Sequence, residues 1–287
     1  MFSAMTVLSR RRFLLGSAGA LGAAALADAF LLEPTAIDVS QHVIPVPGLP
    51  PGLEGVRIAC VSDVHLGGGV SPAARAALAV LARERPDLVL LSGDICNERV
   101  DLPTLTVWAR EARGTAAAFA TLGNWEHAAG IDRATAERTY DRAGIELLYN
   151  SAGRASVRGA TLSVVGIDDP VYGTPDPAEA VKEVGTNPAL WVIHAPGYVD
   201  GIAPNTYPAP AAIFAGHTHG GQIRVPFWTP YTPSGSGRFV AGWYRDTFAP
   251  LYVSRGIGTI TVRARLFCPP ELPIFTLKAG EKPGKGR

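Results

Sequence analysis

The segment that decides the fold is residues 56–65, VRIACVSDVH, in which a short apolar run ends in an aspartate and a histidine. A continuous apolar run of this length is typical of a strand that is buried on both faces of a sheet. A second run, Asp87–Leu91, is followed by Gly93-Asp94, and a third, Thr115–Leu122, by Gly123-Asn124. Each polar pair therefore follows the carboxyl end of a predicted strand, where α/β proteins place their sites.

Helices are predicted between these strands, which gives the first half of the chain a β-α-β-α-β order. Ser71 is the expected N-cap of the first helix, with Pro72 in its first turn. Further helices are expected at Pro103–Arg113, Asp132–Arg142 and Pro177–Val184. The strands expected in the second half are Ile145–Tyr149, Ala155–Val157, Leu162–Val165, Leu190–Ile193, Ala212–Phe214, Gln222–Val225, Pro250–Val253 and Ile274–Leu277. We predict an α/β fold, a sandwich of two β-sheets flanked by helices, that forms one domain over residues 56–280.

The composition is that of a globular protein, and its charge limits the kinds of binding partner to be expected. Net charge is +1, which argues against a nucleic-acid surface and leaves any anion to be bound locally. There are three cysteines, Cys60, Cys96 and Cys268. A small and odd number of cysteines argues against a disulfide framework. Cys96 follows Asp94 closely enough to approach a site, but a small apolar filler is the plainer interpretation.

The N-terminal residues 1–29 are interpreted as a twin-arginine signal. Ser9–Leu14 reads SRRRFL, and residues 13–27 are apolar with many Ala and Gly. We judge this run too short for a membrane span, although Phe30–Leu32 extends it and leaves an ordinary signal or a short anchor as alternatives. Small residues at 25 and 27, and at 27 and 29, offer cleavage sites. The expectation is export through the twin-arginine machinery, to a periplasmic or other extracytoplasmic place or to a membrane anchor, with residues 30–55 as an extended lead-in.

Five of the six histidines lie in the segments that follow predicted strands. They are His65, His127, His194, His217 and His219. Imidazole and carboxylate are the usual nitrogen and oxygen ligands of divalent transition metals. Gly216–His219, GHTH, is the most specific motif, because residues i and i+2 of a strand-like stretch point the same way. The other motifs are weak alone, since Gly-Asp and Gly-Asn are common turns, but together they indicate a metal site.

In their order these motifs resemble those of the calcineurin-like metallophosphoesterases, D-x-H, G-D, G-N-H-[DE], H and G-H-x-H. The resemblance extends to a branch of exported or membrane-bound phosphodiesterases similar to UDP-2,3-diacylglucosamine pyrophosphatase. The branch motifs are GHTHGGQIRVP at Gly216–Pro226, YVSRGIGT at Tyr252–Thr259, and Val262-Arg263 with Pro270-Glu271. The resemblance covers nearly all of residues 56–277.

The resemblance implies a two-metal site and assigns its ligands. Asp63, His65 and His219 would bind one cation, Asn124, His194 and His217 the other, and Asp94 both. Mn, Fe and Zn all suit this set. A water shared by the cations would lose a proton and attack the phosphorus in line. The implied function is a phosphodiesterase or pyrophosphatase that acts on a lipid-linked or other small-molecule diester, in possible contact with a membrane surface. Alternatives are a broad phosphomonoesterase and a metal-binding exported protein without activity.

One position departs from the family pattern. The family has a histidine after the G-N asparagine, where it assists the leaving group, and this chain has Trp125. Either His127 takes over the role from two residues further on, or the leaving group is a stable anion that needs no acid. In a third interpretation Trp125 is a lid and His127 only supports the site.

Other residues of the branch motifs are weaker candidates. Arg224 and Arg255 are predicted to bind substrate, with Arg263 as a further candidate, because guanidinium groups suit phosphate oxygens. We expect only one of the three to do so, since solvated or structural arginines are commoner. Asp168-Asp169 either orients a histidine of the site or caps a turn. The aromatic and proline-rich segment Phe227–Phe239 is a candidate substrate loop or lipid contact, with a cover over the core as the plainer alternative.

Overall fold

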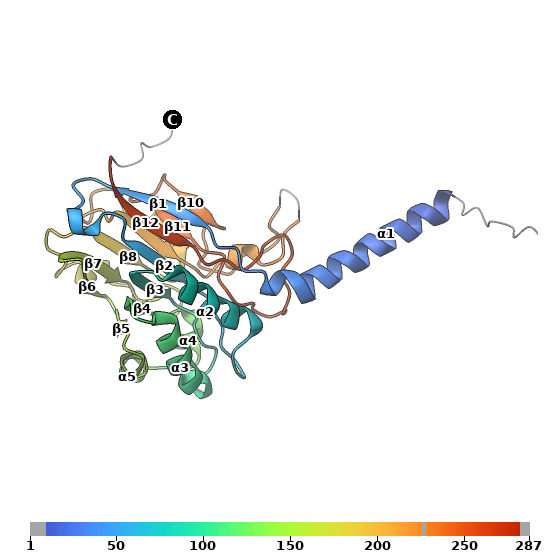
Figure 1. Cartoon of the computed structure of the whole chain (residues 1–287), viewed down its shortest axis with the longest axis horizontal. Helices are drawn as coiled ribbons and strands as arrows, with labels where there is room; N and C mark the ends of the chain where they lie inside the picture. The colour runs from blue at the N-terminus through green and yellow to red at the C-terminus, as the bar shows by residue number, and fades with distance from the viewer. Residues whose placement is uncertain (1–9, 226–227, 282–287) are drawn as a thin grey trace, which may run out of the picture.

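Two mixed sheets of six strands each lie face to face in the computed structural model, which describes residues 10–225 and 228–281 (Figure 1). The first sheet has the order β1 (Gln41–Val46), β12 (Ile274–Ala279), β2 (Arg57–Val61), β3 (Leu88–Ser92), β4 (Ala117–Thr121) and β5 (Glu146–Leu147). The second has the order β10 (Gly242–Tyr244), β11 (Leu251–Val253), β9 (Ala212–Ala215), β8 (Ala189–Val192), β7 (Ala160–Gly166) and β6 (Ser151–Val157). The predicted two-sheet α/β sandwich flanked by helices is confirmed.

The central strands are buried on both faces, which explains their continuous apolar runs. In β2, Ile58 and Cys60 face the second sheet, while Ala59 and Val61 face the helices. All four residues are completely buried. The parallel neighbour β3 repeats the pattern in register, with Leu88 opposite Ile58. Such strands cannot show the apolar-polar alternation of a half-exposed sheet.

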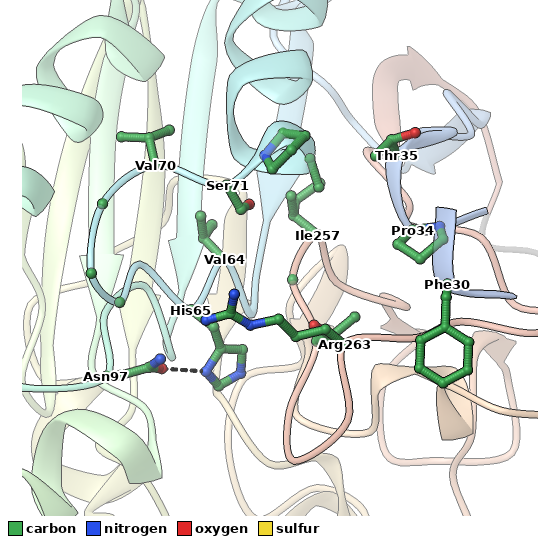
Figure 2. Close-up of a pocket in the computed structure, with 17 residues that line it drawn as sticks. Phe30, Pro34, Thr35, Val64, His65, Val70, Ser71, Asn97, Ile257 and Arg263 are labelled. Atoms are coloured by element: carbon green, nitrogen blue, oxygen red, sulfur yellow. Dashed lines mark hydrogen bonds between the residues drawn. The ribbon is translucent and has the colours of Figure 1, made fainter. Parts of the chain in front are cut away.

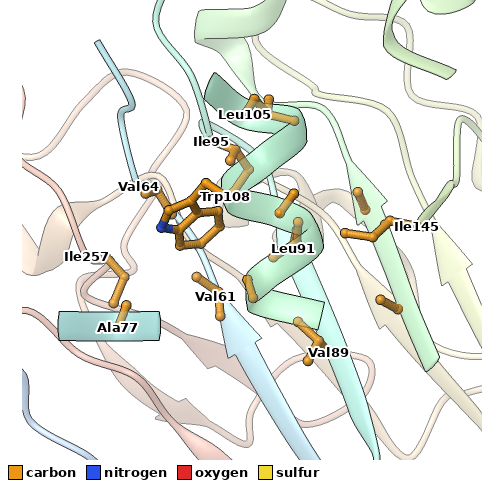
Figure 3. Close-up of a cluster of buried hydrophobic side chains, with 14 of the residues drawn as sticks. Val61, Val64, Ala77, Val89, Leu91, Ile95, Leu105, Trp108, Ile145 and Ile257 are labelled. Carbon is orange, nitrogen blue, oxygen red and sulfur yellow. The ribbon is translucent and has the colours of Figure 1, made fainter. Parts of the chain in front are cut away.

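Helices α2 (Pro72–Glu84), α3 (Leu102–Arg113) and α5 (Arg133–Ala143) cover the outer face of the first sheet. The Ser71 hydroxyl accepts a hydrogen bond from the backbone N–H of Ala74, which confirms the predicted N-cap. Trp108 of α3 is buried between the helices and the sheet (Figure 3), and its indole N–H donates to the carbonyl of Ala74 at 3.0 Å. This layer holds the strands whose carboxyl ends carry the motifs.

Short helices fill the remaining connections. They are η3 (Pro51–Leu53), η4 (Arg99–Asp101), α4 (Asn124–Ala128), α6 (Pro177–Ala180), η5 (Pro196–Gly201) and η6 (His219–Gly221). The helix expected at Pro177–Val184 ends earlier than predicted, and α4 and the edge strand β10 were not predicted. Short elements carry too few residues to establish a period.

The N-terminal helix projects from the body (Figure 1). Helix α1 (Arg10–Ala27) continues through η1 (Asp28–Leu32) and η2 (Glu33–Thr35) without a break. Within it, Leu14–Thr35 has a mean hydropathy of 1.6 over its most apolar window, and only 6% of that window is buried. By length and composition this helix can cross a membrane, whereas the sequence analysis predicted that the apolar run at residues 13–27 is too short to do so. The difference arises because the helix continues past Asp28. Residues 1–9 of the predicted signal lie outside the described part.

The predicted lead-in, residues 30–55, contains more regular structure than expected. Its start is helical as far as Thr35, and Gln41–Val46 forms an edge strand parallel to β12. Ile44 and Val46 are buried while Val43 is exposed, so the strand is anchored on one face only. Sheet pairing with a strand more than 200 residues away in the chain, Ile274–Ala279, decides this conformation. The predicted boundaries at residues 29, 55 and 280 stay predictions.

The predicted strand Gln222–Val225 is wrong. Its backbone forms only isolated bridges, from Ile223 to Leu266 and from Val225 to Trp228. The Gln222 amide instead bonds to the backbone of Ile260 and Val262, which ties this loop to another loop. Pro226 of the branch motif and Phe227 of the predicted aromatic segment lie outside the described residues.

Candidate metal centre

Two clusters of buried side chains lie at the carboxyl ends of the central strands. Asp63, His65 and His219 form cluster A. Asp94, His194 and His217 form cluster B. Within each cluster the candidate ligand atoms lie within 4.8 Å of one another. Asn124 joins cluster B, because its side-chain oxygen lies 3.0 Å from Nε2 of His194 and 2.9 Å from Nδ1 of His217. All seven residues predicted as ligands therefore meet.

Both sheets contribute to this meeting point. The parallel strands β2, β3 and β4 lead to Asp63, Asp94 and Asn124. The parallel pair β8 and β9 leads to His194 and His217. Backbone hydrogen bonds join these loops, from Asp63 N–H to the carbonyl of Gly93 at 3.1 Å and from Gly216 N–H to that of His194 at 3.0 Å. Parallel strands have their carboxyl ends at the same edge of a sheet, so the residues that follow the strands of each sheet lie close together at the two clusters.

The backbone at these residues is strained. Five of the six cluster residues have a positive φ, namely Asp63 (53°), His65 (51°), Asp94 (54°), His217 (70°) and His219 (50°). Residues with a side chain avoid this left-handed region, at a cost on the order of 1–3 kcal/mol each. Strain of this kind persists only where surrounding contacts impose it, and it gathers at functional sites.

Two glycines permit the close packing of the loops. A Cβ atom on Gly216 would lie 2.4 Å from Oδ2 of Asp63, and one on Gly123 would lie 2.2 Å from Oδ1 of Asp94. Neither carboxylate has room to move aside, since both are buried. The Gly-His and Gly-Asn pairs of the sequence are therefore steric requirements of the site.

Each histidine of cluster B points one ring nitrogen toward the centre of the cluster and the other toward a backbone carbonyl. His217 Nε2 lies 2.8 Å from the carbonyl of Ser234, and His194 Nδ1 lies 2.8 Å from that of Ser92. A carbonyl only accepts, so these nitrogens carry the protons. The inward atoms, Nδ1 of His217 and Nε2 of His194, lie 3.2 Å apart, with the Asn124 oxygen beside them. Atoms that converge in this way can offer their lone pairs to a cation once His194 has released its second proton.

Cluster A is arranged similarly. His65 Nδ1 lies 2.8 Å from the Asn97 side-chain oxygen, so its Nε2 faces inward, 3.1 Å from Nε2 of His219. Oδ1 of Asp63 lies 3.5 Å from the same His219 nitrogen. Nδ1 of His219 is buried and has no hydrogen-bond partner among the described residues. At most one proton can occupy the gap between the two imidazoles, and a cation satisfies both nitrogens at once.

Asp94 lies between the clusters. Its Oδ2 is 3.1 Å from Nε2 of His194 in cluster B and 3.8 Å from Nε2 of His65 in cluster A. Its Oδ1 accepts the backbone N–H of Trp125 at 2.8 Å. One carboxylate oxygen therefore faces both clusters, as a bridging ligand must.

Burial sets the protonation states of the site. Burial lowers the pKa of His65 to about 4 and that of His217 to about 3, and it lowers the pKa of His219 as well. Neutral imidazoles are the form that binds metals. Burial also raises the pKa of Asp94, to about 7. Burial is the largest single effect and disfavours a charged His194, but the carboxylates of Asp94, Asp63 and Asp169 together outweigh it and raise the pKa of His194 to about 10.

Comparison with known proteins identifies the family. The profile described as calcineurin-like phosphoesterase matches residues 56–221, which is more than half of the chain and includes both clusters. The chain belongs to the calcineurin-like phosphoesterase family. The resemblance seen in the sequence is confirmed, and the protein is a metal-dependent phosphoester hydrolase.

Relatives of this phosphoesterase match it almost end to end. It is 28% identical to "Uncharacterized metallophosphoesterase YkuE" of Bacillus subtilis, over 96% of this chain and 99% of the relative. It is 26% identical to "Phosphodiesterase YaeI" of Escherichia coli, over 94% of this chain and 100% of the relative. It is 25% identical to "UDP-2,3-diacylglucosamine pyrophosphatase LpxG" of Chlamydia trachomatis, over 85% of this chain and 90% of the relative.

Glu126 positions the phosphoesterase loops, a role that the sequence analysis missed. Its buried carboxylate accepts four backbone N–H groups, those of Gly123, Asp94, Ile95 and Cys96. It therefore fixes the loop after β3 to the loop after β4. Its place as the acidic residue of the G-N-H-[DE] motif was the available signal. Cys96 is buried, as the plainer interpretation expected.

Trp125 and His127 lie in different surroundings. The indole of Trp125 packs edge-on against the His65 ring at 5.3 Å. His127 lies in neither cluster, and its Nε2 contacts Oδ1 of Asp168 at 2.7 Å. Burial is the largest single effect and disfavours its charged form, but the hydrogen bond to Asp168 and the charges of Asp168, Asp169 and Glu126 together raise the pKa of His127. Asp168 therefore orients a histidine, while Asp169 caps the following turn through the N–H groups of residues 171 and 172.

The three arginines differ in what they contact. Arg255 is held by two carboxylates, Asp38 and Glu271, which leaves its charge largely neutralised. Arg224 donates its Nε–H to the carbonyl of Gly220. Arg263 is exposed and lines a cavity next to His65. Roles for Arg224 and Arg255 in substrate binding stay predictions.

Glu126→Gln tests the positioning role. The new amide group would face two of the four backbone donors, so we expect a loss of about 1–3 kcal/mol in the free energy of unfolding. We also expect at least about tenfold weaker Mn²⁺ binding, because the Asp94 loop loses its support. Urea unfolding and metal titration measure these effects.

Glu137→Gln on the surface of α5 is the matched control, because the Glu137 side chain is partly exposed and, among the described residues, forms an ion pair with Arg133 alone. It should change stability by less than about 0.5 kcal/mol. Equal behaviour of the two variants would contradict the role given to Glu126.

Proposed function

We propose that this phosphoesterase cleaves phosphodiester or pyrophosphate bonds with two divalent cations, one held in each cluster. Asp63, His65 and His219 would hold the first cation, and Asn124, His194 and His217 the second. The position of Asp94 between the clusters carries the proposal, since one carboxylate oxygen faces ligands of both. Mn, Fe and Zn all accept this mixture of imidazole, carboxylate and amide ligands.

When bound, the two cations would supply a deprotonated water as nucleophile and positive charge next to the phosphoryl oxygens. The chain's own residues prepare for this role. Burial keeps three imidazoles neutral and available at neutral pH. His194 must release its proton when a cation binds, so binding weakens as the pH falls.

A diester or pyrophosphate substrate is supported by Trp125. An indole cannot protonate a leaving group, so the site favours leaving groups that are stable anions. One relative is named as a phosphodiesterase and another as a UDP-2,3-diacylglucosamine pyrophosphatase, and both names support this substrate class. The compound in the second name is a lipid. A broad phosphomonoesterase is the alternative, and substrate preference separates the two.

The first test measures metal content and activity together, on the full chain after loading with Mn²⁺. We expect about two metal ions per chain. Bis-p-nitrophenyl phosphate should be cleaved faster than p-nitrophenyl phosphate. His217→Ala should bind fewer than two ions and lose at least about 100-fold in kcat.

His42→Gln is the control, because this histidine lies outside both clusters. It should keep both ions and its activity. One ion or none in the wild type would contradict the two-metal proposal, and faster monoester cleavage would contradict the substrate class.

For substrates with a more basic leaving group, we propose His127 as the proton donor. Asp168 holds the ring through a hydrogen bond and contributes to the raised pKa of His127, which favours the protonated form that a proton donor needs. We expect His127→Asn to lower kcat for methyl phenyl phosphate by about 100-fold, and for bis-p-nitrophenyl phosphate by less than tenfold, since nitrophenolate leaves without an acid.

Asparagine can keep the hydrogen bond to Asp168, so this variant removes the acid while preserving the contact. Equal losses on both substrates would indicate a supporting role for His127, and no loss on either would favour cleavage without an acid.

We also propose that the N-terminus is a twin-arginine export signal that associates the protein with a membrane. The motif SRRRFL and the projecting apolar helix support this proposal. Replacing both Arg10 and Arg11 by lysine should abolish export in a host with the twin-arginine machinery, as measured by cell fractionation. Arg12→Lys is the control and should be exported normally. Export of the double variant would contradict the proposal.

A further inference from the structure

A cavity of about 480 Å³ opens beside His65 (Figure 2). The loop after β2 and the loop at residues 257–259 form two of its walls, and the end of the N-terminal helical segment forms a third, through Phe30, Pro34 and Thr35. The cavity therefore joins cluster A to the apolar helix. The segment that forms this third wall lies outside residues 56–221, the part that the family profile matches.

The N-terminal wall is fastened to the body. The Ala29 carbonyl accepts the backbone N–H of Arg265 at 2.9 Å. The carboxylate of Glu33 accepts the backbone N–H groups of Phe267, at 2.9 Å, and of Cys268. Ala29 and Glu33 are both buried. Cleavage after residue 27 or 29, at the sites expected from the sequence, would leave Phe30 and Glu33 in the remaining chain.

The cavity has one cationic group, and apolar side chains form part of its otherwise polar lining. Arg263 extends toward the His65 ring (Figure 2) and has no hydrogen-bond or ion-pair partner in the part of the chain that the structure describes. Val64 and Ile257 are buried behind the cavity, and Phe30 is 51% exposed at its side. An uncommitted guanidinium beside apolar walls suits a ligand that is anionic at one end and apolar at the other.

We propose that this cavity is a substrate subsite that binds the apolar alcohol group of an amphiphilic phosphodiester. Arg263 pairs with the phosphodiester anion at cluster A, and the alkyl chain lies along Phe30 and Pro34, the apolar residues of the N-terminal wall. The inference rests on the proposed phosphodiesterase function and names its substrate class. In the uncleaved chain, the helical segment that carries Phe30 continues into the exposed apolar surface of α1, so a lipid in the same membrane would reach the subsite directly.

The test compares two soluble substrates, methyl p-nitrophenyl phosphate and hexyl p-nitrophenyl phosphate. Each turnover consumes one water, forms a bond from its oxygen to phosphorus, breaks the bond to nitrophenolate and releases the alkyl phosphate. The full Mn²⁺-loaded chain in lipid nanodiscs should have at least about tenfold higher kcat/KM for the hexyl ester, because the cavity removes its methylene groups from water.

Phe30→Asn should reduce the hexyl-to-methyl ratio of kcat/KM by about fivefold or more, since an amide replaces the apolar wall. Leu31→Asn is the matched control. Leu31 is the next residue, is 69% exposed and does not line the cavity. It should leave the ratio unchanged, which also separates the subsite from simple partition of the hexyl ester into the nanodisc.

Arg263→Gln should raise KM for both esters by about tenfold and leave their ratio unchanged, because it removes an anion contact that both share. Arg263→Lys should restore part of the loss.

The outcomes separate the two proposals. No hydrolysis of either ester would overturn the proposed function. Hydrolysis of both with equal kcat/KM, or a ratio that Phe30→Asn and Leu31→Asn leave alike, would overturn the subsite alone.

Discussion

The rest of the structure depends on the buried carboxylate of Asp94, which faces cluster A and cluster B at once. A charge at this depth is unfavourable unless other charges or donors balance it. The protein places His194 and the Trp125 N–H against it, and Glu126 holds its loop by three backbone hydrogen bonds and joins that loop to Gly123 by a fourth. Such an arrangement costs stability in the absence of a cation, and two cations would turn the same carboxylate into the central ligand.

The sandwich provides the rigidity that this arrangement requires. Apolar side chains fill the space between the sheets and beneath α2, α3 and α5, so the central strands have no freedom to shift. Their carboxyl ends then present five residues with left-handed backbone at one place. Strain on the order of 1–3 kcal/mol per residue is tolerable because the cores are large, and the strain preorganises the candidate ligands before any cation arrives.

The end of the N-terminal helical segment is bound to the loops beside the candidate metal centre. Glu33 and Ala29 fasten its end to the loop at residues 265–268. The buried guanidinium of Arg265 bonds in turn to the carbonyls of Gly256, Gly258 and Cys268, next to the cavity. A segment that the sequence assigns to targeting and lead-in thus contributes to the surroundings of the candidate metal centre. Anchoring and substrate access would then be set by one continuous piece of the chain, as the proposed subsite requires.

The sequence by itself determined the two-sheet fold and the seven candidate ligands. Buried parallel strands have continuous apolar runs, and ligands directly after them keep their order along the chain, as in Asp63-Val64-His65 and Gly216–His219. Only the tertiary structure decided the rest. It made β1 a strand through pairing with β12, and it made Gln222 a loop anchor rather than a strand residue. The tertiary structure pairs the charge of Arg255 with Asp38, and it places Arg263 in the same cavity as His65. The physical reason is that these outcomes depend on partners far away in the chain, whose positions no local pattern encodes.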